Sequence, residues 1–314
     1  MEELTVPAEG EGERLDRWLA RRTGRSRAEI QRVIRGGRAL VNGAPARPSY
    51  LLQAADRVEI ELPPREELAP QPEPLALKII FEDEDIIVVD KPAGLVTHPA
   101  PGHLGGTLVN ALLYHCRLAE TDDPRRPGIV QRLDRETSGV LIAAKSEEAH
   151  KNLVAQFKQG TVRKRYLALV HGTVAEDEGL IELPLGRHAL KREEIRVSAG
   201  GKRAMTEFLV LERFKDADKS LVEARPRTGR MHQIRVHLSY IGHPVVGDRK
   251  YGRRRDGAAR MMLHAWEIEL RHPRTGEQIR FSAPPPVEFS AWLSGGPDGG
   301  SPTLPDRRGR SPGR

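Results

Sequence analysis

A proline-rich acidic stretch at residues 63–74 most limits what this 314-residue chain can fold into. It reads Pro-Pro-Arg-Glu-Glu-Leu-Ala-Pro-Gln-Pro-Glu-Pro. Proline lacks a backbone donor and fixes φ, so neither a helix nor a central strand can run through this stretch. The sequence therefore predicts a linker between a small module at 12–62 and a larger domain at 75–293. Residues 294–314 are rich in glycine and proline and predict a disordered tail.

The small module carries a concentrated positive charge. Residues 12–62 hold eleven arginines against six acidic residues, although the whole chain has a net charge of only +7. Apolar residues at helical spacing predict two helices, and Asn42-Gly43 is typical of a tight hairpin turn. Four arginines crowd the start and the polar face of the second helix and are RNA-binding candidates: Arg25, Arg27, Arg32 and Arg35. An ordinary solvated helix face explains the same charges equally well.

The larger domain is predicted to have an α+β fold built on a mixed, mainly antiparallel sheet, and the module a small α/β fold. Alternating and apolar runs predict strands at 77–81, 86–90, 139–145, 162–171, 204–214, 220–226, 265–271 and 277–282. Helices are expected at 107–116, 146–159 and 231–241. Strands and helices do not alternate regularly, which argues against a parallel α/β sheet.

Several function classes find no support in the sequence. There is no glycine-rich nucleotide loop and no His-Glu-x-x-His motif, and the single cysteine, Cys116, excludes an internal disulfide and a multi-cysteine metal site. We therefore expect no metal and no cofactor. No apolar run has the length of a membrane helix, and the acidic N-terminus is unlike a signal peptide. These features predict a soluble, cytoplasmic protein.

Three polar segments are candidates for chemistry. Asp134 stands between two arginines in the loop that leads into an apolar strand, Tyr166 follows three cations on a predicted strand, and residues 225–237 join a strand to a cation-rich helix. A loop carboxylate is a common functional group, and a tyrosine beside cations suits stacking on a base. From chemistry alone, however, a surface Asp-Arg turn, a core tyrosine and a solvated helix start are equally ordinary interpretations.

Taken together, the segments resemble the RluA-type RNA pseudouridine synthases. The resemblance rests on Gly-Ile-Val-Gln-Arg-Leu-Asp-Arg-Glu-Thr-Ser-Gly at 128–139, with matching motifs in order at 90–99, 164–170, 227–237, 242–248 and 263–265. It covers roughly residues 75–285. The module looks like the S4-like RNA-binding domain found in a small-subunit ribosomal protein and some tRNA synthetases. This combination is similar to the RluD/RluC-like branch, which acts on large-subunit ribosomal RNA.

The resemblance implies roles for individual residues. Asp134 would be the catalytic carboxylate, Arg235 would pair with it, and Tyr166 would stack on the uracil and help remove the proton from its fifth ring carbon. The remaining implied substrate-binding residues are Arg132, which would help to displace the base, Leu263, which would line the pocket, Arg230 and Gln233. One position departs from the family pattern: Gln131 replaces a histidine before Arg-Leu-Asp, which removes a titrating group but keeps hydrogen-bonding capacity.

The family's reaction turns uridine into pseudouridine without a cofactor. Asp134 would act at the sugar, either as a nucleophile or as a base toward an elimination, and the sequence does not choose between the two. The resemblance implies an RNA partner, most simply large-subunit ribosomal RNA, and a monomeric enzyme. Transfer RNA as the substrate, and a non-catalytic RNA-binding factor for ribosome assembly, are the alternatives.

Overall fold

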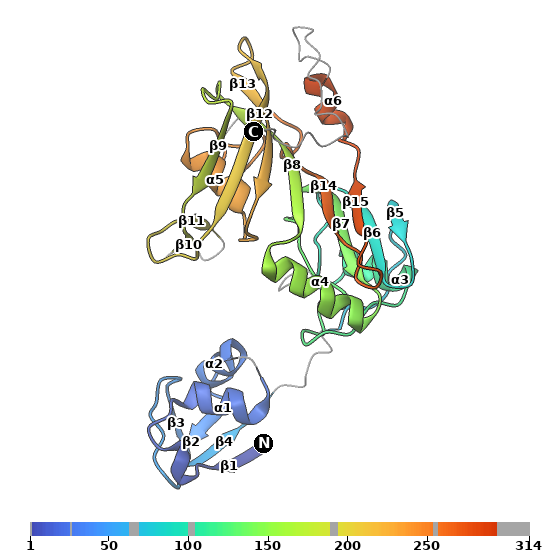
Figure 1. Cartoon of the computed structure of the whole chain (residues 1–314). Helices are drawn as coiled ribbons and strands as arrows, with labels where there is room; N and C mark the ends of the chain where they lie inside the picture. Colours follow the sequence, from blue (N-terminus) through green and yellow to red (C-terminus); the bar gives the residue numbers. More distant parts are fainter. Residues whose placement is uncertain are drawn as a thin grey trace. The chain divides into compact units, whose positions relative to one another are not determined.

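The computed structural model describes residues 2–25, 27–62, 69–99, 104–188, 194–253 and 257–293. By its internal contacts the chain divides into an N-terminal unit, residues 1–67, and a C-terminal unit, residues 68–314 (Figure 1). The first half of the predicted linker, residues 63–68, and the predicted tail, residues 294–314, lie outside the described residues. The two units are described one at a time.

The N-terminal unit is a four-stranded antiparallel sheet with two helices packed against it. The elements are β1 (Glu2–Thr5), the 3-10 turn η1 (Ala8–Gly10), α1 (Leu15–Thr23), α2 (Arg27–Arg35), β2 (Ala39–Val41), β3 (Ala44–Pro45) and β4 (Arg57–Ile60). The sheet order is β1-β4-β2-β3. The sheet extends beyond the predicted module at 12–62, because β1 pairs with β4 at the edge of the sheet. Asn42 and Gly43 have the positive φ angles that the hairpin turn requires.

A buried carboxylate organises the helices of this unit. The Asp16 side chain is inaccessible to solvent and accepts hydrogen bonds from Arg14 at 3.1 Å, Arg27 at 3.1 Å and Gln31. Although burial alone would raise it, these donors hold the pKa of Asp16 well below its usual range. Because Asp16 lies on α1 and Arg27 and Gln31 lie on α2, the carboxylate fixes the two helices against each other.

The C-terminal unit is built around one large sheet. Among the described residues, nine strands form it in the order β5-β6-β7-β14-β8-β13-β12-β9, with β15 paired to β14. The bounds are β5 (Ile79–Glu82), β6 (Ile86–Lys91), β7 (Ser138–Ala144), β8 (Arg163–His171), β9 (Glu178–Glu182), β12 (Met205–Phe214), β13 (Lys219–Pro226), β14 (Leu263–Arg271) and β15 (Gln278–Ser282). Only the pair β7–β14 is parallel, which confirms the predicted mixed, mainly antiparallel α+β fold.

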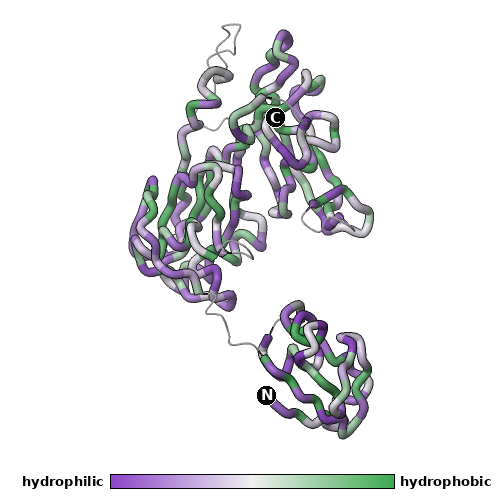
Figure 2. Tube along the Cα trace, turned by 180° about the vertical axis from the view of Figure 1, so that it is seen from behind, coloured by the Kyte–Doolittle hydropathy of each residue, from purple (hydrophilic) through white to green (hydrophobic). Residues whose placement is uncertain are grey.

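Four helices and a small ribbon accompany this sheet in the described part of the unit. They are α3 (Leu108–His115), α4 (Glu147–Gln159), α5 (Gln233–Tyr240), α6 (Val287–Leu293) and the ribbon of β10 (Leu185–Arg187) and β11 (Ile195–Val197). Hydrophobic residues concentrate along the strands (Figure 2). The largest core cluster lies between β6, β7, α3 and α4, and two further clusters flank β8 on its two faces.

The eight strands and three helices predicted for this domain are all present, with ends that differ from the prediction by at most two residues. The prediction missed β9, the ribbon β10–β11 and helix α6. These elements are short, and two of the strands contain a glycine, so their apolar alternation spans too few residues to be recognised. The missed elements all lie outside the apolar centre of the sheet.

The parallel pair β7–β14 brings two loops that are distant in the sequence to the same end of these two central strands. His264 is opposite Ser138, and Ala265 is opposite Gly139. The loop that carries Asp134 runs directly into β7, and Leu263 begins β14. Both loops therefore lie at the N-terminal ends of the two strands. Gly139 has a φ of 116°, and a Cβ atom there would collide with the backbone of Ala265. Only glycine allows this close approach.

We predict that Gly139→Ala lowers the free energy of unfolding by at least about 3 kcal/mol, because it adds a backbone clash to an unfavourable φ angle. Thermal unfolding of the purified protein measures the effect. The matched control is Gly276→Ala, since Gly276 has a φ of 74° with open space around it and should cost only about 1–2 kcal/mol. Equal losses in the two variants would show that the β7–β14 approach carries no special constraint.

Candidate active site

A cleft in the C-terminal unit collects every substrate-site residue predicted for that domain. Its volume is about 740 Å³, and it is lined by the loop before β7, the end of α4, the start of β8 and the segment from β13 into α5. The predicted residues that line it are Arg132, Asp134, Tyr166, Arg230, Gln233, Arg235 and Leu263. The fold thus brings together residues that are up to 131 positions apart in the sequence, from Arg132 to Leu263 (263 − 132).

An ion-pair chain lies at the centre of the cleft. The guanidinium of Arg235, on α5, donates to Asp134 through Nη1 at 2.9 Å and to Asp248 through Nε and Nη2 at 2.7 and 2.8 Å. Asp248 also accepts the backbone N–H groups of Lys250 and Tyr251. Arg235 and Asp248 are buried, whereas 17% of the Asp134 side chain remains exposed. Of the two carboxylates that pair with Arg235, only Asp134 is therefore accessible to a substrate.

The surroundings of Arg235 and Asp248 favour the charged forms of both side chains. Burial works against the charge on Arg235, but the two carboxylates outweigh it and raise the pKa of the guanidinium. Burial likewise opposes the Asp248 charge, yet the hydrogen bonds from Arg235 hold the pKa of Asp248 below its usual range. The Arg235 guanidinium also lies over the ring of Tyr251, 5.0 Å from its centroid, which adds a cation–π contact. Asp248 and the Tyr251 ring thus hold the Arg235 guanidinium in the position from which it donates to Asp134.

Tyr166 stands beside this carboxylate as a neutral phenol. It lies on β8, where its cross-strand neighbours are Ala224 on β13 and Ala265 on β14, so both adjacent side chains are small. Burial, assisted by the negative charge of Asp134, raises the pKa of the Tyr166 hydroxyl. A half-buried aromatic ring between two alanines, next to a carboxylate, offers a stacking surface for a flat ligand.

Several residues that hold this site were not predicted individually. His232 precedes α5 in a left-handed conformation with a φ of 54°, bonds Tyr251 through Nδ1 at 2.7 Å and places Nε2 3.9 Å from Asp134. Burial lowers the pKa of His232 to about 4, so it is neutral at physiological pH. Asp248 and His232 lie within motifs that carried the family resemblance, and this was the only signal that pointed to them.

Lys91 secures the loop of Asp134 from behind. Its side chain is fully buried at the end of β6, and its Nζ donates to the carbonyl oxygens of Pro92, Leu95 and Arg135 at 2.8, 2.9 and 3.2 Å. Burial lowers the pKa of Lys91 to about 7. Because Arg135 directly follows Asp134, Lys91 ties the loop of the carboxylate to the core of the sheet.

The structure places Gln233 in the wall of the cleft, and its contact with substrate stays a prediction. Its side-chain oxygen accepts from the Thr228 hydroxyl and the Arg230 backbone, and its amide donates to Met205 and Thr206. All four bonds are internal, so Gln233 shapes the turn at 228–230. Arg230 is exposed at the rim and donates to the carbonyl of Arg203 at 3.0 Å.

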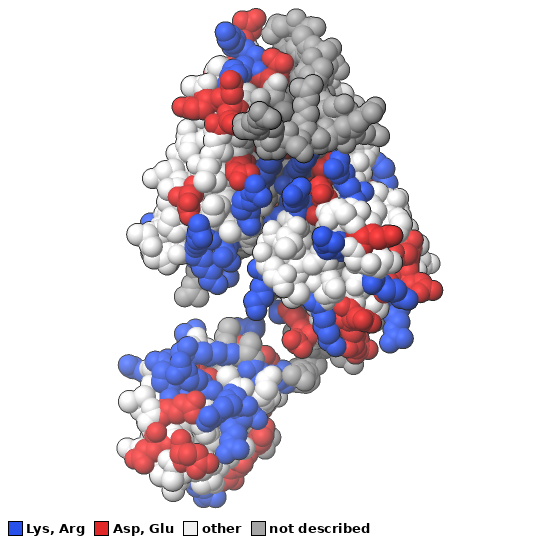
Figure 3. Space-filling model, in the orientation of Figure 1, with Lys and Arg blue, Asp and Glu red and all other residues white. Residues whose placement is uncertain are grey.

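The four arginines predicted for the N-terminal unit fall into two pairs. Arg25 is paired with Glu29 at 2.6 Å and Arg27 with the buried Asp16 at 3.0 Å, so carboxylates already engage both. Arg32 and Arg35 are exposed on α2. On the face of the unit shown in Figure 3, basic side chains, all of them arginine in this unit, gather over the two helices. Arg32 and Arg35 are therefore the better candidates for contact with phosphate.

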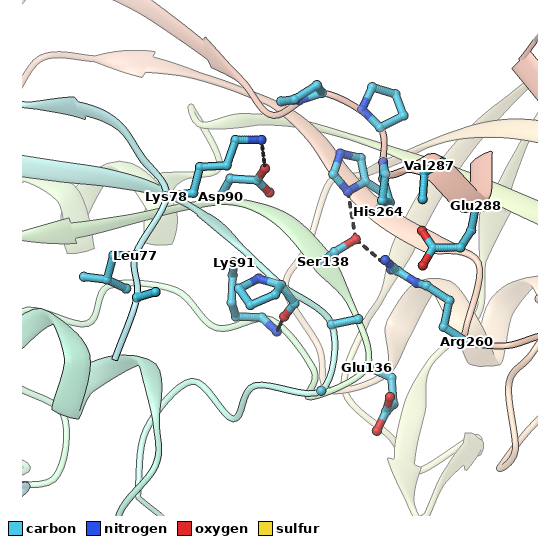
Figure 4. Close-up of a pocket in the computed structure, with 17 residues that line it drawn as sticks. Leu77, Lys78, Asp90, Lys91, Glu136, Ser138, Arg260, His264, Val287 and Glu288 are labelled. Atoms are coloured by element: carbon cyan, nitrogen blue, oxygen red, sulfur yellow. Dashed lines mark hydrogen bonds and ion pairs between the residues drawn. The ribbon is translucent and has the colours of Figure 1, made fainter. Parts of the chain in front are cut away.

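A second pocket of about 910 Å³ borders the other side of the loop that carries Asp134 (Figure 4). In it the Ser138 hydroxyl lies 2.9 Å from His264 Nδ1 and accepts from Arg260 at 2.7 Å, while His264 Nε2 bonds the carbonyl of Ala283. Lys78 and Asp90 pair with each other at 2.8 Å. The polar groups named here satisfy one another, so this cluster holds the start of β7 against β14.

A third polar cluster has a structural explanation. Asp83, Asp85 and His272 place potential metal ligands within 4.8 Å of one another, the one such group among the described residues. Their atoms are already used: Asp85 pairs with Arg274, and Asp83 accepts two backbone N–H groups and contacts His272 at 2.8 Å. The cluster joins the β5–β6 turn to the β14–β15 turn.

Comparison with known proteins agrees with the fold and the cleft, which together define an enzyme that works on RNA. Residues 85–240 match the family model described as RNA pseudouridylate synthase, and residues 13–58 match the S4 domain. The chain belongs to the RNA pseudouridine synthase family. In the described part of the chain, no helix is long and apolar enough to cross a membrane.

Individual relatives support this assignment. An uncharacterised RNA pseudouridine synthase of Bacillus subtilis is 45% identical over 93% of this chain and 96% of its own. The ribosomal large subunit pseudouridine synthase D of Pseudomonas aeruginosa is 40% identical over 92% and 93%, respectively. Among solved structures, human RNA pseudouridylate synthase domain containing 1 superposes with a TM-score of 0.56 at 31% identity, covering 70% of this chain and 89% of that chain.

We predict that the folded state loses stability on mild acidification. His98 and His264 are buried, and His232 has 13% of its side chain exposed. Burial lowers the pKa of each to about 4, against about 6.5 in an unfolded chain. Between these values the unfolded state binds more protons, so the free energy of unfolding falls as the pH drops from about 6.5 toward 4. Each histidine should contribute about 1–2 kcal/mol of loss by pH 5.

Scanning calorimetry at pH 7.5, 6.0 and 5.0 tests this expectation. The thermal midpoint should fall steadily below pH 6.5. The paired carboxylates do not account for a change in this range, because a carboxyl whose folded pKa is depressed loses its contribution only below its unfolded value near 4. A midpoint that is constant or rises between pH 6.5 and 5 contradicts the buried, neutral state of these histidines.

Proposed function

We propose that this enzyme isomerises specific uridines in large-subunit ribosomal RNA to pseudouridine, with Asp134 as the catalytic carboxylate. The observation that carries the proposal is the hydrogen bond from Arg235 to Asp134 in a cleft that also contains the Tyr166 ring. Arg235 holds the partly exposed Asp134 side chain in place, and a carboxylate can attack carbon or remove a proton.

The reaction breaks the bond between uracil and the sugar, turns the base and rejoins it through its fifth ring carbon. Asp134 acts at the sugar, either as a nucleophile on the anomeric carbon or as a base toward an elimination, and both remain open. No atom is gained or lost, and the proposed chemistry uses no metal and no cofactor. After the new bond forms, the ring carbon loses one proton and the ring nitrogen released from the sugar gains one, so substrate and product have the same atoms.

Tyr166 contributes first as a stacking surface. Its raised pKa makes the phenolate rare, so the ring meets the uracil as a neutral phenol. Part of that rise comes from the charge of Asp134. Proton removal follows the new bond between base and sugar, so in the proposed reaction Tyr166 first stacks on the base and then helps to remove the proton from the ring carbon.

The target uridine has to leave its stack to reach the cleft, at a cost of about a few kcal/mol. Arg132 suits the role of displacing it, because this arginine is exposed at the cleft and forms no ion pair with any residue in the described ranges. Leu263 adds an apolar wall at the start of β14. Stacking on Tyr166 and phosphate contacts offset the cost of extruding the base.

The preference for ribosomal RNA rests on the N-terminal unit and on the relatives. The unit matches the S4 domain, and the Pseudomonas aeruginosa relative is named for the large ribosomal subunit. Transfer RNA is the alternative substrate. We further propose that the enzyme acts in the cytoplasm, where its RNA substrate is made, and as a monomer, because one chain supplies all the lining residues of the cleft.

We predict that Asp134→Asn folds and binds RNA but makes pseudouridine at least about 10³-fold more slowly, because the amide neither ionises nor attacks the sugar. Unmodified large-subunit ribosomal RNA transcribed in vitro is the substrate, and pseudouridine mapping is the measurement. Glu136→Gln is the matched control, since it removes a carboxylate two positions along the same loop and should keep near-normal activity.

Two outcomes would contradict this proposal. Wild-type rates in Asp134→Asn would remove Asp134 from the chemistry. A wild-type enzyme that binds ribosomal RNA yet modifies neither ribosomal nor transfer RNA would favour a non-catalytic assembly factor.

We also predict that replacing Arg32 and Arg35 together with glutamine weakens RNA binding and flattens its dependence on salt. Each lost phosphate contact should lower the slope of log affinity against log salt by about 0.7–0.9. Filter binding at several salt concentrations measures the slope. Arg57→Gln is the control, because Arg57 is paired with Glu3 at 2.8 Å. An unchanged slope in the double variant would make the α2 arginines an ordinary solvated face.

A further inference from the structure

Apart from Arg126 Nε, which lies 3.3 Å from a carboxylate oxygen of Asp123, two buried polar atoms in the cleft wall lack hydrogen-bond partners among the described residues. They are Nδ1 of His98 and Nε2 of Gln131, and neither atom bonds any residue that the structure describes. Both residues line the cleft, and only 7% of His98 is exposed. A buried polar group without a partner costs about 1–3 kcal/mol, so two of them in one wall call for an explanation.

The fold holds these two residues firmly in place. The Thr97 hydroxyl donates to the carbonyl of Leu133 at 2.8 Å, which ties the segment before His98 to the segment after Gln131. The backbone N–H groups of Leu108 and Val109, at the start of α3, donate to the carbonyls of Val96 and Thr97. The unpartnered atoms are therefore fixed features of the wall and belong to the same corner of the cleft.

The charges around His98 differ from those around the catalytic carboxylate. Burial, followed by the charges of Arg126 and Arg132, lowers the pKa of His98 to about 4, with Asp123 opposing and Arg125 adding to the effect. The charge of Asp134 acts instead on Tyr166, Lys91 and His232. His98 thus presents a neutral imidazole set among arginines.

The cleft is large enough for two separate groups of the substrate. Its volume of about 740 Å³ lies in the range of pockets that enclose whole drug-sized ligands, which are larger than a single uracil. If the target base stacks on Tyr166 at the Asp134 end, the rest of the volume remains for the RNA next to it. Arg132 lines the cleft, is exposed and forms no ion pair with a described residue, so a cation for a neighbouring phosphate is present.

We propose that His98 and Gln131 form a second subsite, which reads the nucleobase next to the target uridine. The Gln131 amide donates to an oxygen or ring nitrogen on the edge of that base, and the neutral imidazole of His98 supplies the second hydrogen bond. Neutral groups suit a base edge, whereas the surrounding arginines suit phosphate. The inference rests on the proposed function, since it requires an RNA with its target base in the cleft.

The test uses the uridine mapped with unmodified large-subunit ribosomal RNA. Short RNAs that contain this uridine are made with the natural sequence and with an abasic residue on one side or the other. Single-turnover rates and affinities are measured for the wild-type enzyme, Gln131→Met and His98→Leu. Both substitutions remove the hydrogen-bonding atom and keep an apolar side chain of comparable size. Gln159→Met, at the exposed rim of the cleft, is the matched control.

We expect Gln131→Met and His98→Leu to lower kcat/KM about 10- to 100-fold on the natural RNA. On the RNA with the correct neighbour made abasic, the wild-type enzyme should lose the same factor and the two variants should lose no more. His98→Asn keeps a polar atom near the position of Nδ1 and should restore part of the rate. The thermal midpoints of Gln131→Met and His98→Leu should not fall, because each substitution removes a buried group that had no partner.

Three results would overturn the inference. Equal losses for the variants on natural and abasic RNA, together with lower thermal midpoints, would assign a structural role to these positions. Unchanged rates on the natural RNA would show that the two atoms meet no substrate group. A wild-type enzyme that modifies no RNA would overturn the proposed function and this inference with it, a result that is distinct from the first two.

Discussion

The buried guanidinium of Arg235 is the interaction on which the rest of the site depends. Burying an arginine is costly unless opposite charge and hydrogen bonds compensate it, and here Asp248 supplies two bonds and Asp134 a third. Because Asp248 is held by backbone donors, Arg235 keeps a partner even when Asp134 engages a substrate. In the proposed reaction Arg235 therefore stays compensated whether or not Asp134 carries its charge, and the arginine does not have to be reorganised.

Three separate elements must be positioned for this ion-pair chain to exist. Helix α5 carries Arg235, the segment after it carries Asp248, and the loop before β7 carries Asp134. Lys91 anchors that loop to the end of β6 through the Arg135 carbonyl, and Ser138 with His264 closes β7 onto β14. The large sheet thus acts as the rigid base from which a short polar loop presents one carboxylate.

Sequence reasoning recovered the strands of the large sheet because their apolar alternation is local information. The missed strand β9 is short and lies at one edge of the large sheet. The missed ribbon β10–β11 is a separate small sheet of two short strands. The site is different, because Asp134 and Arg235 stand 101 positions apart and only the fold brings them together. Chemistry alone left Asp134 as an ordinary turn residue, and the ordered motifs supplied the assignment. Gln233 and Arg27 show the remaining limit, since a side chain's partners decide its role and sequence identifies only its chemical type.

The distribution of charged and neutral groups explains how one cleft serves both binding and chemistry. Arg235 is engaged by two carboxylates and fixes the position of Asp134. Arg132, like Arg32 and Arg35 of the N-terminal unit, is exposed and suited to contact with phosphate. Tyr166, His98 and His232 are neutral at physiological pH because burial opposes their charged forms. Uracil is itself uncharged, so a neutral lining accepts the base without desolvating extra charge. Of the two carboxylates that pair with Arg235, Asp134 is the one that remains accessible for the proposed action on the sugar.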